Sequence, residues 1–298
     1  MDQCITERFV VVDDFLPDDQ TRAMREDIDA HFADAQNHRP DTHYVWNYWH
    51  VPGTYTYLKT VPERVIARQK VDAFVQALRT WAAVNVGFGH VTWPFLSMYV
   101  PGCAQGVHND SVNGRLGYVF SLTRNARKTI GGETIVFQDR DLFRSNLDKP
   151  AAGSAIFDLV EPRFNRLTLF DDRVPHAVQR VDGSMDPVEG RFVLHGHISE
   201  AGAVAQGPLH PDAMREPVAA ALEELRAGAA KGAHGPIVYC VEIGAGGAVQ
   251  RLRPLLDRLV SPFNADLEPV RKAIAERVAA LRFPEAAAPT RANIPLIF

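Results

Sequence analysis

The chain has 298 residues, a hydrophobic content of 46%, a charged content of 23% and a formal net charge of −4. This length predicts a main domain of about 200 residues with a smaller second domain, and the composition is that of an ordinary soluble globular protein. The slightly acidic balance gives no electrostatic reason to expect nucleic acid or an anionic membrane as a partner.

The cysteines and the N-terminal residues indicate the expected compartment. Cys4, Cys103 and Cys240 lie far apart without CxxC spacing, which argues against a disulfide scaffold or a structural zinc site. The opening residues, MDQCITERFVVVDDFL, carry acids early, and neither they nor any later apolar run is long enough to span a membrane. We therefore expect a cytoplasmic protein without a membrane partner.

The N-terminal part of the chain predicts a strand, a helix, an aromatic segment and a second helix. Residues 8–16 indicate a strand that runs into a turn, and Pro17 with the two acids after it is typical of a helix start. Residues 42–58 are rich in aromatic side chains, which favours strands or a long loop over a helix. The second helix ends before Gly87 and is predicted by apolar residues at helical spacing: Val71, Phe74, Val75 and Leu78.

The middle of the chain is rich in predicted strands, whereas predicted helices and strands alternate in the C-terminal part. Between residues 91 and 198, short β-rich runs are separated by turn residues, as in a jelly roll. After residue 200 the sequence predicts a helix, the strand IVYCVEI, a GAGG turn, a second strand or short helix, a long helix and the final strand ANIPLIF. The predicted fold is mostly β with flanking helices: a double-stranded β-helix over residues 1–205 and a small α/β domain over residues 206–298.

The segment SMYVPGCAQGVHND, residues 97–110, ends in a candidate pair of metal ligands. His108 and Asp110 alternate at the end of a predicted strand, so both side chains point to the same side. Barrel closure can bring a third ligand, His176, from the start of a later predicted strand. Two imidazoles and one carboxylate are the ligand set of non-haem ferrous oxygenases. A second pair, His210 and Asp212, lies at a predicted helix start, where an acid is favoured without a metal.

A basic residue heads the last strand of the predicted barrel. Arg191 begins RFVLHGHI, and a guanidinium at the bottom of a pocket can hold a dicarboxylate through paired hydrogen bonds. Arg180 is the alternative for this role. His195 and His197 share the alternation of Arg191, so a rival metal triad and a supporting or substrate-binding role both remain open for them.

The ordered combination of these motifs resembles the Fe(II)/2-oxoglutarate-dependent dioxygenases, and within them the prolyl-4-hydroxylase-like branch. The resemblance covers about residues 8–200. It includes the opening FVVVDDFLPDD, the Tyr99 and Pro-Gly ahead of the His-x-Asp pair, the segment YVFSLTRNARKTIGGETIVF and the strand RFVLHGHI. Two features depart from the family pattern: Val193 replaces a frequent hydroxyl residue, and the interval between His176 and Arg191 is long.

The resemblance implies a site and a reaction. His108, Asp110 and His176 would be the catalytic ligands of Fe(II), and 2-oxoglutarate would bind the metal with its far carboxylate on Arg191 and a hydrogen bond from Tyr99. With O₂ as cosubstrate, such enzymes release carbon dioxide and succinate and hydroxylate an unactivated C–H bond. Since halogenating relatives replace the carboxylate by a small residue, Asp110 argues against halogenation.

The expected substrate is an amino-acid residue, free or in a peptide or peptide natural product, by analogy with the same branch. Candidate substrate contacts are Trp49, Tyr55, Arg115 and Arg124, although strand aromatics are commonly core residues and arginines are commonly exposed. The alternative function is a catalytically silent peptide-binding protein built on the same barrel.

The C-terminal segment is similar to the C-terminal domains of TonB-like proteins. The similarity rests on CVEIGAGGAV, the long helix, the following LRFP and the terminal IPLIF. It implies a strand edge that accepts a peptide or a second copy of the chain. A domain that merely covers the barrel is the alternative.

Overall fold

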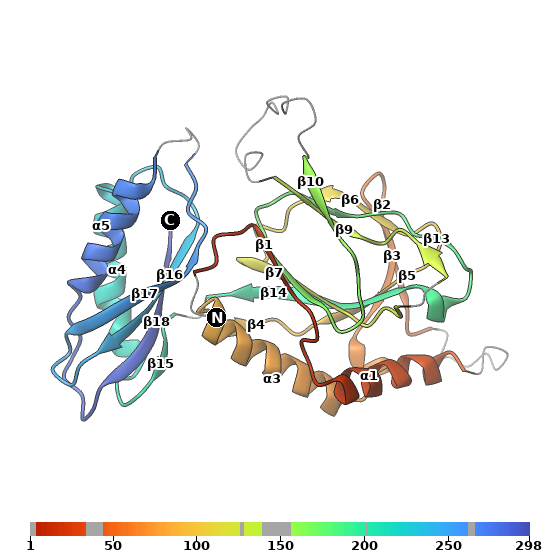
Figure 1. The fold of residues 1–298 in the computed structure, drawn as a ribbon, viewed down its shortest axis with the longest axis horizontal. Helices are drawn as coiled ribbons and strands as arrows, with labels where there is room; N and C mark the ends of the chain where they lie inside the picture. The colour runs from red at the N-terminus through yellow and green to blue at the C-terminus, as the bar shows by residue number, and fades with distance from the viewer. Residues whose placement is uncertain (1–3, 34–43, 126–127, 139–155, 201, 262–265) are drawn as a thin grey trace. The chain divides into compact units, whose positions relative to one another are not determined.

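A computed structural model describes residues 4–33, 44–125, 128–138, 156–200, 202–261 and 266–298 (Figure 1). Residues 42 and 43 of the predicted aromatic segment lie outside these ranges. The chain forms two compact units. The first comprises Arg8–Ala77 and Val91–His197, and the second comprises Met1–Glu7, Leu78–His90 and Ile198–Phe298.

The first unit is built on a curled twelve-stranded sheet (Figure 1). Its strands follow the order β1-β11-β7-β14-β5-β3-β6-β12-β9-β10, with β2 beside β3 and β4 beside β14. Strands remote in sequence thus become neighbours, which confirms the predicted double-stranded β-helix. The strands are β1 Phe9–Val12, β2 Asn47–Val51, β3 Tyr55–Thr60, β4 His90–Val91, β5 Phe95–Tyr99, β6 Ala104–His108, β7 Leu116–Ser121, β9 Thr134–Phe137, β10 Phe157–Val160, β11 Leu167–Asp171, β12 His176–Val178 and β14 Arg191–Ser199. A separate two-stranded ladder joins β8 Thr129–Ile130 to β13 Asp182–Gly183.

The flanking helices are α1 Asp18–His31 and α3 Arg68–Asn85, with short 3₁₀ turns η1 Pro62–Arg64 and η3 Pro187–Glu189. Two acids occupy the first turn of α1, where their negative charges interact favourably with the positive end of the helix dipole. In α3, Phe74 is fully buried and stacks on Phe120 of β7 with ring centroids 4.8 Å apart. The first part of α3 therefore covers the sheet through its apolar face, as the spacing of its apolar residues predicts.

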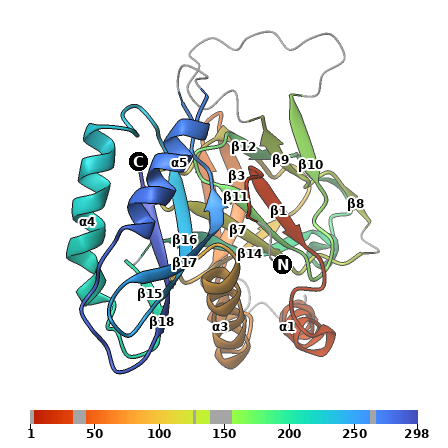
Figure 2. The same cartoon turned by 60° about the vertical axis from the view of Figure 1, so that its left-hand side comes forward.

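The second unit contains a small antiparallel sheet of four strands in the order β15-β18-β16-β17. The strands are β15 Val204–Gln206, β16 Pro236–Ile243, β17 Val249–Asp257 and β18 Thr290–Ile297, and the helices are α4 Asp212–Ala227 and α5 Glu268–Ala279. Both helices contact the sheet and each other (Figure 2). The segment after the GAGG turn is a strand, β17, which resolves the alternative that the sequence leaves open.

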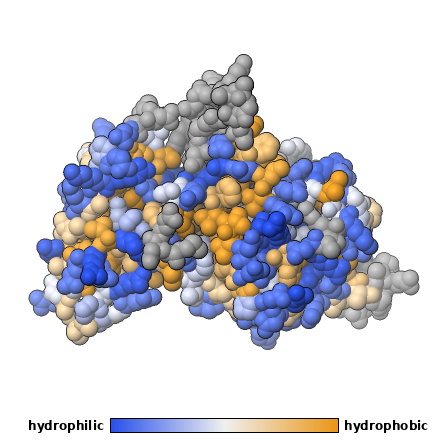
Figure 3. Space-filling model, viewed as in Figure 1, coloured by the Kyte–Doolittle hydropathy of each residue, from blue (hydrophilic) through white to orange (hydrophobic). Residues whose placement is uncertain are grey.

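Helix α5 shows why the second unit is stable as an α/β layer. Its Ile274 and Val278 are fully buried against the sheet, while mainly hydrophilic residues face solvent in Figure 3. This amphipathic pattern confirms the predicted small α/β fold. The resemblance to TonB-like domains and the binding of a partner at a strand edge stay predictions.

Within the described ranges, no helix combines the length and the apolar character that crossing a bilayer requires.

Candidate metal centre

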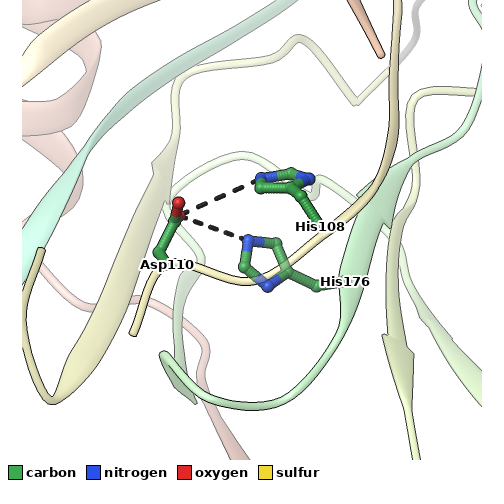
Figure 4. Close-up of side chains that lie close together, drawn as sticks. All are labelled: His108, Asp110 and His176. Carbon is green, nitrogen blue, oxygen red and sulfur yellow. Dashed lines mark ion pairs between the residues drawn. The ribbon is translucent and has the colours of Figure 1, made fainter. Parts of the chain in front are cut away.

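Strand pairing brings the three predicted metal ligands together. His108 is the last residue of β6, His176 is the first residue of β12, and the two are direct partners in the antiparallel register. Their ring centroids lie 4.3 Å apart. The carboxylate of Asp110 turns toward both rings, with its Oδ2 4.0 Å from Nε2 of His108 and 3.4 Å from Nε2 of His176 (Figure 4).

Backbone carbonyls fix the orientation of both imidazoles. Nδ1 of His108 lies 2.8 Å from the carbonyl oxygen of Gly106, and Nδ1 of His176 lies 3.0 Å from that of Val174. Because a carbonyl only accepts, we assign the ring proton to Nδ1 in each case. Each Nε2 therefore keeps its lone pair and points toward Asp110, which is the arrangement of metal-binding histidines.

Asp110 is held in place and in its charged form. Its backbone N–H donates to the carbonyl of Asp172 at 2.8 Å, and the Asn113 side chain donates to Oδ1 at 3.3 Å. Burial acts to raise the pKa of Asp110, but hydrogen bonding and charge from the protonated forms of His176, His108 and His197 outweigh it and bring the pKa to about 2. Burial and the neighbouring His176 lower the pKa of His108. An ionised carboxylate and a neutral imidazole are the forms that a metal requires.

These residues fit a ferrous ion. One ligand atom from each of His108, Asp110 and His176 lies within 4.8 Å of the other two. Two imidazoles and one carboxylate, with no thiolate, suit Fe(II) better than they suit a structural zinc site.

The three ligands line a cavity of about 560 Å³ inside the curled sheet, a size typical of small-molecule sites. Asp110 is its one acidic lining residue among those described. The lining comes mainly from β3, β5, β6, β7, β12 and β14: Trp49, Tyr55, Tyr57, Lys59, Thr92, Trp93, Phe95, Tyr99, Gln105, His108, Asp110, Asn113, Gly117, Tyr118, Val119, Thr134, Phe170, His176, Val178, Arg191, Val193, His195, Gly196 and His197.

The predicted cosubstrate residues lie together in this cavity. Arg191 is 1% exposed, and it is the register partner of Tyr99 in the β14–β5 pair. Its guanidinium donates to Oγ1 of Thr134 at 3.3 Å and lies 4.7 Å from the Tyr99 ring centroid. The Tyr99 hydroxyl donates to Gln105 at 3.0 Å, and burial raises the pKa of Tyr99, so this hydroxyl stays protonated. The alternative residue, Arg180, is exposed, pairs with Asp182 at 3.4 Å and is not a lining residue.

The four candidate substrate residues fall into two groups. Trp49 and Tyr55 line the cavity, and the ring of Tyr55 packs edge-on against His108 with centroids 4.9 Å apart. Arg115 and Arg124 are not among the lining residues. Arg124 instead forms ion pairs with Asp29 at 2.8 Å and Glu189 at 3.3 Å.

A buried carboxylate beside the metal ligands was not predicted from the sequence. Asp172 is fully buried and accepts a hydrogen bond from Nδ1 of His197 at 3.0 Å. Burial raises the pKa of Asp172 to about 6. Burial acts to lower the pKa of His197, but the hydrogen bond to Asp172 and the charges of Asp172 and Asp110 together outweigh it and raise that pKa. Asp110, Asp172 and His197 form a second group of possible metal ligands that shares Asp110 with the first.

In the described part of the chain, His195 does not belong to a metal triad, which was the rival role that the sequence left open for it. Its Nε2 lies 2.7 Å from Oγ of Ser97. Burial, together with Arg191 and Lys59, lowers its pKa to about 3. His195 is therefore a neutral hydrogen-bonding residue of the cavity, outside both groups of possible metal ligands found among the described residues.

Comparisons with known proteins give structural likenesses only. No protein-family model matches the sequence, and no curated protein matches it. Similar solved structures include a Pseudomonas putida prolyl-4-hydroxylase, with 19% identity over 65% of this chain and 94% of that chain and a TM-score of 0.45. A Trichoplax adhaerens prolyl hydroxylase in complex with a hypoxia inducible factor oxygen degradation domain peptide fragment has 14% identity, covers 64% and 82% of the two chains and has a TM-score of 0.44. SnoN, a non-heme alpha ketoglutarate dependent epimerase from nogalamycin biosynthesis, has 12% identity, coverages of 66% and 80% and a TM-score of 0.44. These are likenesses of fold.

Proposed function

We propose that this protein is an Fe(II)- and 2-oxoglutarate-dependent oxygenase that hydroxylates an unactivated C–H bond of an amino-acid residue in a peptide or peptide natural product. The observation that carries this proposal is the convergence of His108, Asp110 and His176 on the wall of a cavity that also contains a buried arginine. Fe(II) and 2-oxoglutarate, when bound, supply the oxidising chemistry with O₂.

The residues of the chain have separate tasks in this proposal. His108, Asp110 and His176 hold the metal, and their hydrogen bonds to backbone and neighbouring groups keep the ligand atoms directed at one point. Arg191 binds the far carboxylate of 2-oxoglutarate, and the protonated hydroxyl of Tyr99 offers a second donor.

The preference for an amino-acid residue rests on the motif resemblance to the prolyl-4-hydroxylase-like branch. The cavity supports it in one respect, because Trp49 and Tyr55 line it with aromatic surface and the ring of Tyr55 packs against His108. Aromatic walls suit the apolar part of a side chain or a peptide backbone.

Succinate release tests this proposal. Tag-free protein with Fe(II), 2-oxoglutarate and O₂ is expected to release succinate above the blank, and a candidate peptide is expected to accelerate the release. His108→Ala should abolish the signal, whereas His210→Ala, at the second His-x-Asp pair, should leave it unchanged. Equal succinate from wild type and His108→Ala would instead support the silent peptide-binding alternative.

A further inference from the structure

A lysine lies in the same cavity, between two aromatic rings. Lys59 follows Tyr55 and Tyr57 at alternate positions of β3, so its side chain shares their face and lines the cavity. Its Nζ lies 3.7 Å from the ring centroid of Trp49 and 4.4 Å from that of Phe95. The rings orient the ammonium group through cation–π attraction but supply no counter-charge.

No acidic side chain compensates Lys59 within the described part of the chain. The structure gives it no ion pair there, and the one acidic lining residue, Asp110, belongs to the candidate metal site. Burial lowers the pKa of Lys59, and no opposite charge counters this effect. Lys59 and Arg191 both line the cavity, which makes the part around them electropositive.

The charges of the proposed complex leave this lysine without a partner. A ferrous ion carries two positive charges, which the two carboxylates of 2-oxoglutarate match. In the sum of formal charges for the cavity, the one negative charge of Asp110 offsets the positive charge of Arg191. One positive charge, that of Lys59, remains for the second substrate. A cavity that keeps one uncompensated cation favours a ligand of the opposite charge.

We propose that Lys59, flanked by Trp49 and Phe95, is the subsite for a carboxylate of the substrate, so that the substrate is an acidic molecule with an apolar portion. A carboxylate fits better than a phosphate dianion because a single positive charge is left to be matched. The aromatic rings then contact the apolar portion beside the carboxylate. This inference rests on the proposed function and names the substrate class of the same site.

Matched pairs of probes test the subsite. Tag-free protein is loaded with Mn(II) and 2-oxoglutarate without oxygen, so that Arg191 is engaged by the cosubstrate. Dissociation constants are then measured by ligand-observed NMR for 3-phenylpropionate against 3-phenylpropionamide, and for N-acetylvaline against N-acetylvalinamide. At least one carboxylate is expected to bind about tenfold more tightly than its amide, the lower end of the effect of a charge-assisted hydrogen bond.

Variants assign the preference to the lysine. Lys59→Met should remove it and Lys59→Arg should keep it, whereas Lys272→Met, at an exposed lysine of α5, should not change it. Equal binding of both carboxylates and their amides to the wild type would overturn the inference, and that comparison does not depend on a variant folding. A carboxylate preference that survives Lys59→Met, or tighter binding of phenyl phosphate than of either carboxylate, would also overturn it.

The cosubstrate measurement separates this inference from the proposed function. Lys59→Met should leave the dissociation constant of 2-oxoglutarate within about twofold of the wild-type value. A tenfold weakening would assign Lys59 to the cosubstrate and overturn the substrate subsite. If the wild type does not bind 2-oxoglutarate, the proposed function fails, and the dependence of the probe preference on Lys59 in that same protein still decides the subsite.

Discussion

The two His-x-Asp pairs of this chain give a matched test of the metal site. In the first pair, Oδ2 of Asp110 lies 4.0 Å from the His108 ring, and in the second, Oδ2 of Asp212 lies 3.4 Å from the His210 ring. The local distances therefore do not distinguish them. The first pair has His176 as a third ligand and the second pair is exposed at the start of α4, so Asp110→Asn should weaken metal binding and Asp212→Asn should not.

The size of the effect follows from ligand loss and linkage. Removing a group that only orients a metal ligand costs about 10- to 100-fold in affinity, so losing the Asp110 carboxylate should cost at least about 100-fold. At a metal concentration of 100 times the wild-type Kd, binding stabilises the wild type by about 2.7 kcal/mol and the variant by about 0.4 kcal/mol. The difference corresponds to a shift of about 5 °C in the metal-dependent Tm.

Thermal unfolding of tag-free protein with and without Mn(II) measures this difference, after the wild-type Kd has been determined by calorimetry. Each variant is compared with its own metal-free state, so any change in intrinsic stability cancels. If Asp110→Asn keeps the wild-type metal shift, or if Asp212→Asn loses it to the same extent, Asp110 is not a metal ligand and the proposed oxygenase lacks its metal site.

Three further predictions concern the cavity and the backbone. In Mn(II)-loaded protein, Arg191→Met should raise the Kd of 2-oxoglutarate about 100-fold, the effect of two charge-assisted hydrogen bonds, whereas Arg180→Met should not; calorimetry giving the reverse order would assign the carboxylate to Arg180. Because the folded protein holds His195 neutral down to a pKa of about 3, the unfolded state binds more protons below about pH 6.5, and the free energy of unfolding falls from there toward pH 3. In denaturant titrations across that pH range, His195→Gln should reduce the total fall in the free energy of unfolding by no more than roughly 5 kcal/mol. An unchanged fall would exclude His195 as its source. Gly131 and Gly53 both have positive φ, but a Cβ at Gly131 would collide with the carbonyl oxygen of Arg180 while one at Gly53 meets open space. Gly131→Ala should therefore cost about 2–4 kcal/mol and Gly53→Ala about 1 kcal/mol in the same titrations, and equal costs would contradict the collision.

The sequence predicted that the candidate metal ligands lie together because strand alternation has a period of two. His108 and Asp110 must point to one side if the strand extends to its end, and only barrel closure was needed to add His176. Arg191 followed in the same way from its place at the head of the last strand. The hydrogen bonds that orient the two rings could not be predicted, because they depend on the path of the backbone around Gly106 and Val174.

Residues whose role depends on register were missed. Residues 42–58 allowed strands or a loop, and only the β2–β3 hairpin shows that Lys59 stands on the cavity face. The signal was present in the alternation of Tyr55, Tyr57 and Lys59, but it has no meaning until the segment is known to be a strand. Arg124, by contrast, was predicted as a candidate substrate residue but does not line the cavity. Nothing in its local sequence indicates the ion pairs with Asp29 and Glu189.

Strand β14 shows how one strand can supply opposite electrostatic properties to a single cavity. His195 and His197 lie two positions apart on the same face, yet the pKa of His195 falls to about 3 and the pKa of His197 is raised. His195 is half-buried near two cations, whereas His197 donates to the buried carboxylate of Asp172. The cavity is therefore divided along β14: an electropositive part around Arg191 and His195 suits anionic ligands, and a part around His197 lies beside the carboxylates of the candidate metal site. This division would allow the proposed dicarboxylate, metal ion and acidic substrate to occupy one cavity without competing for the same charges.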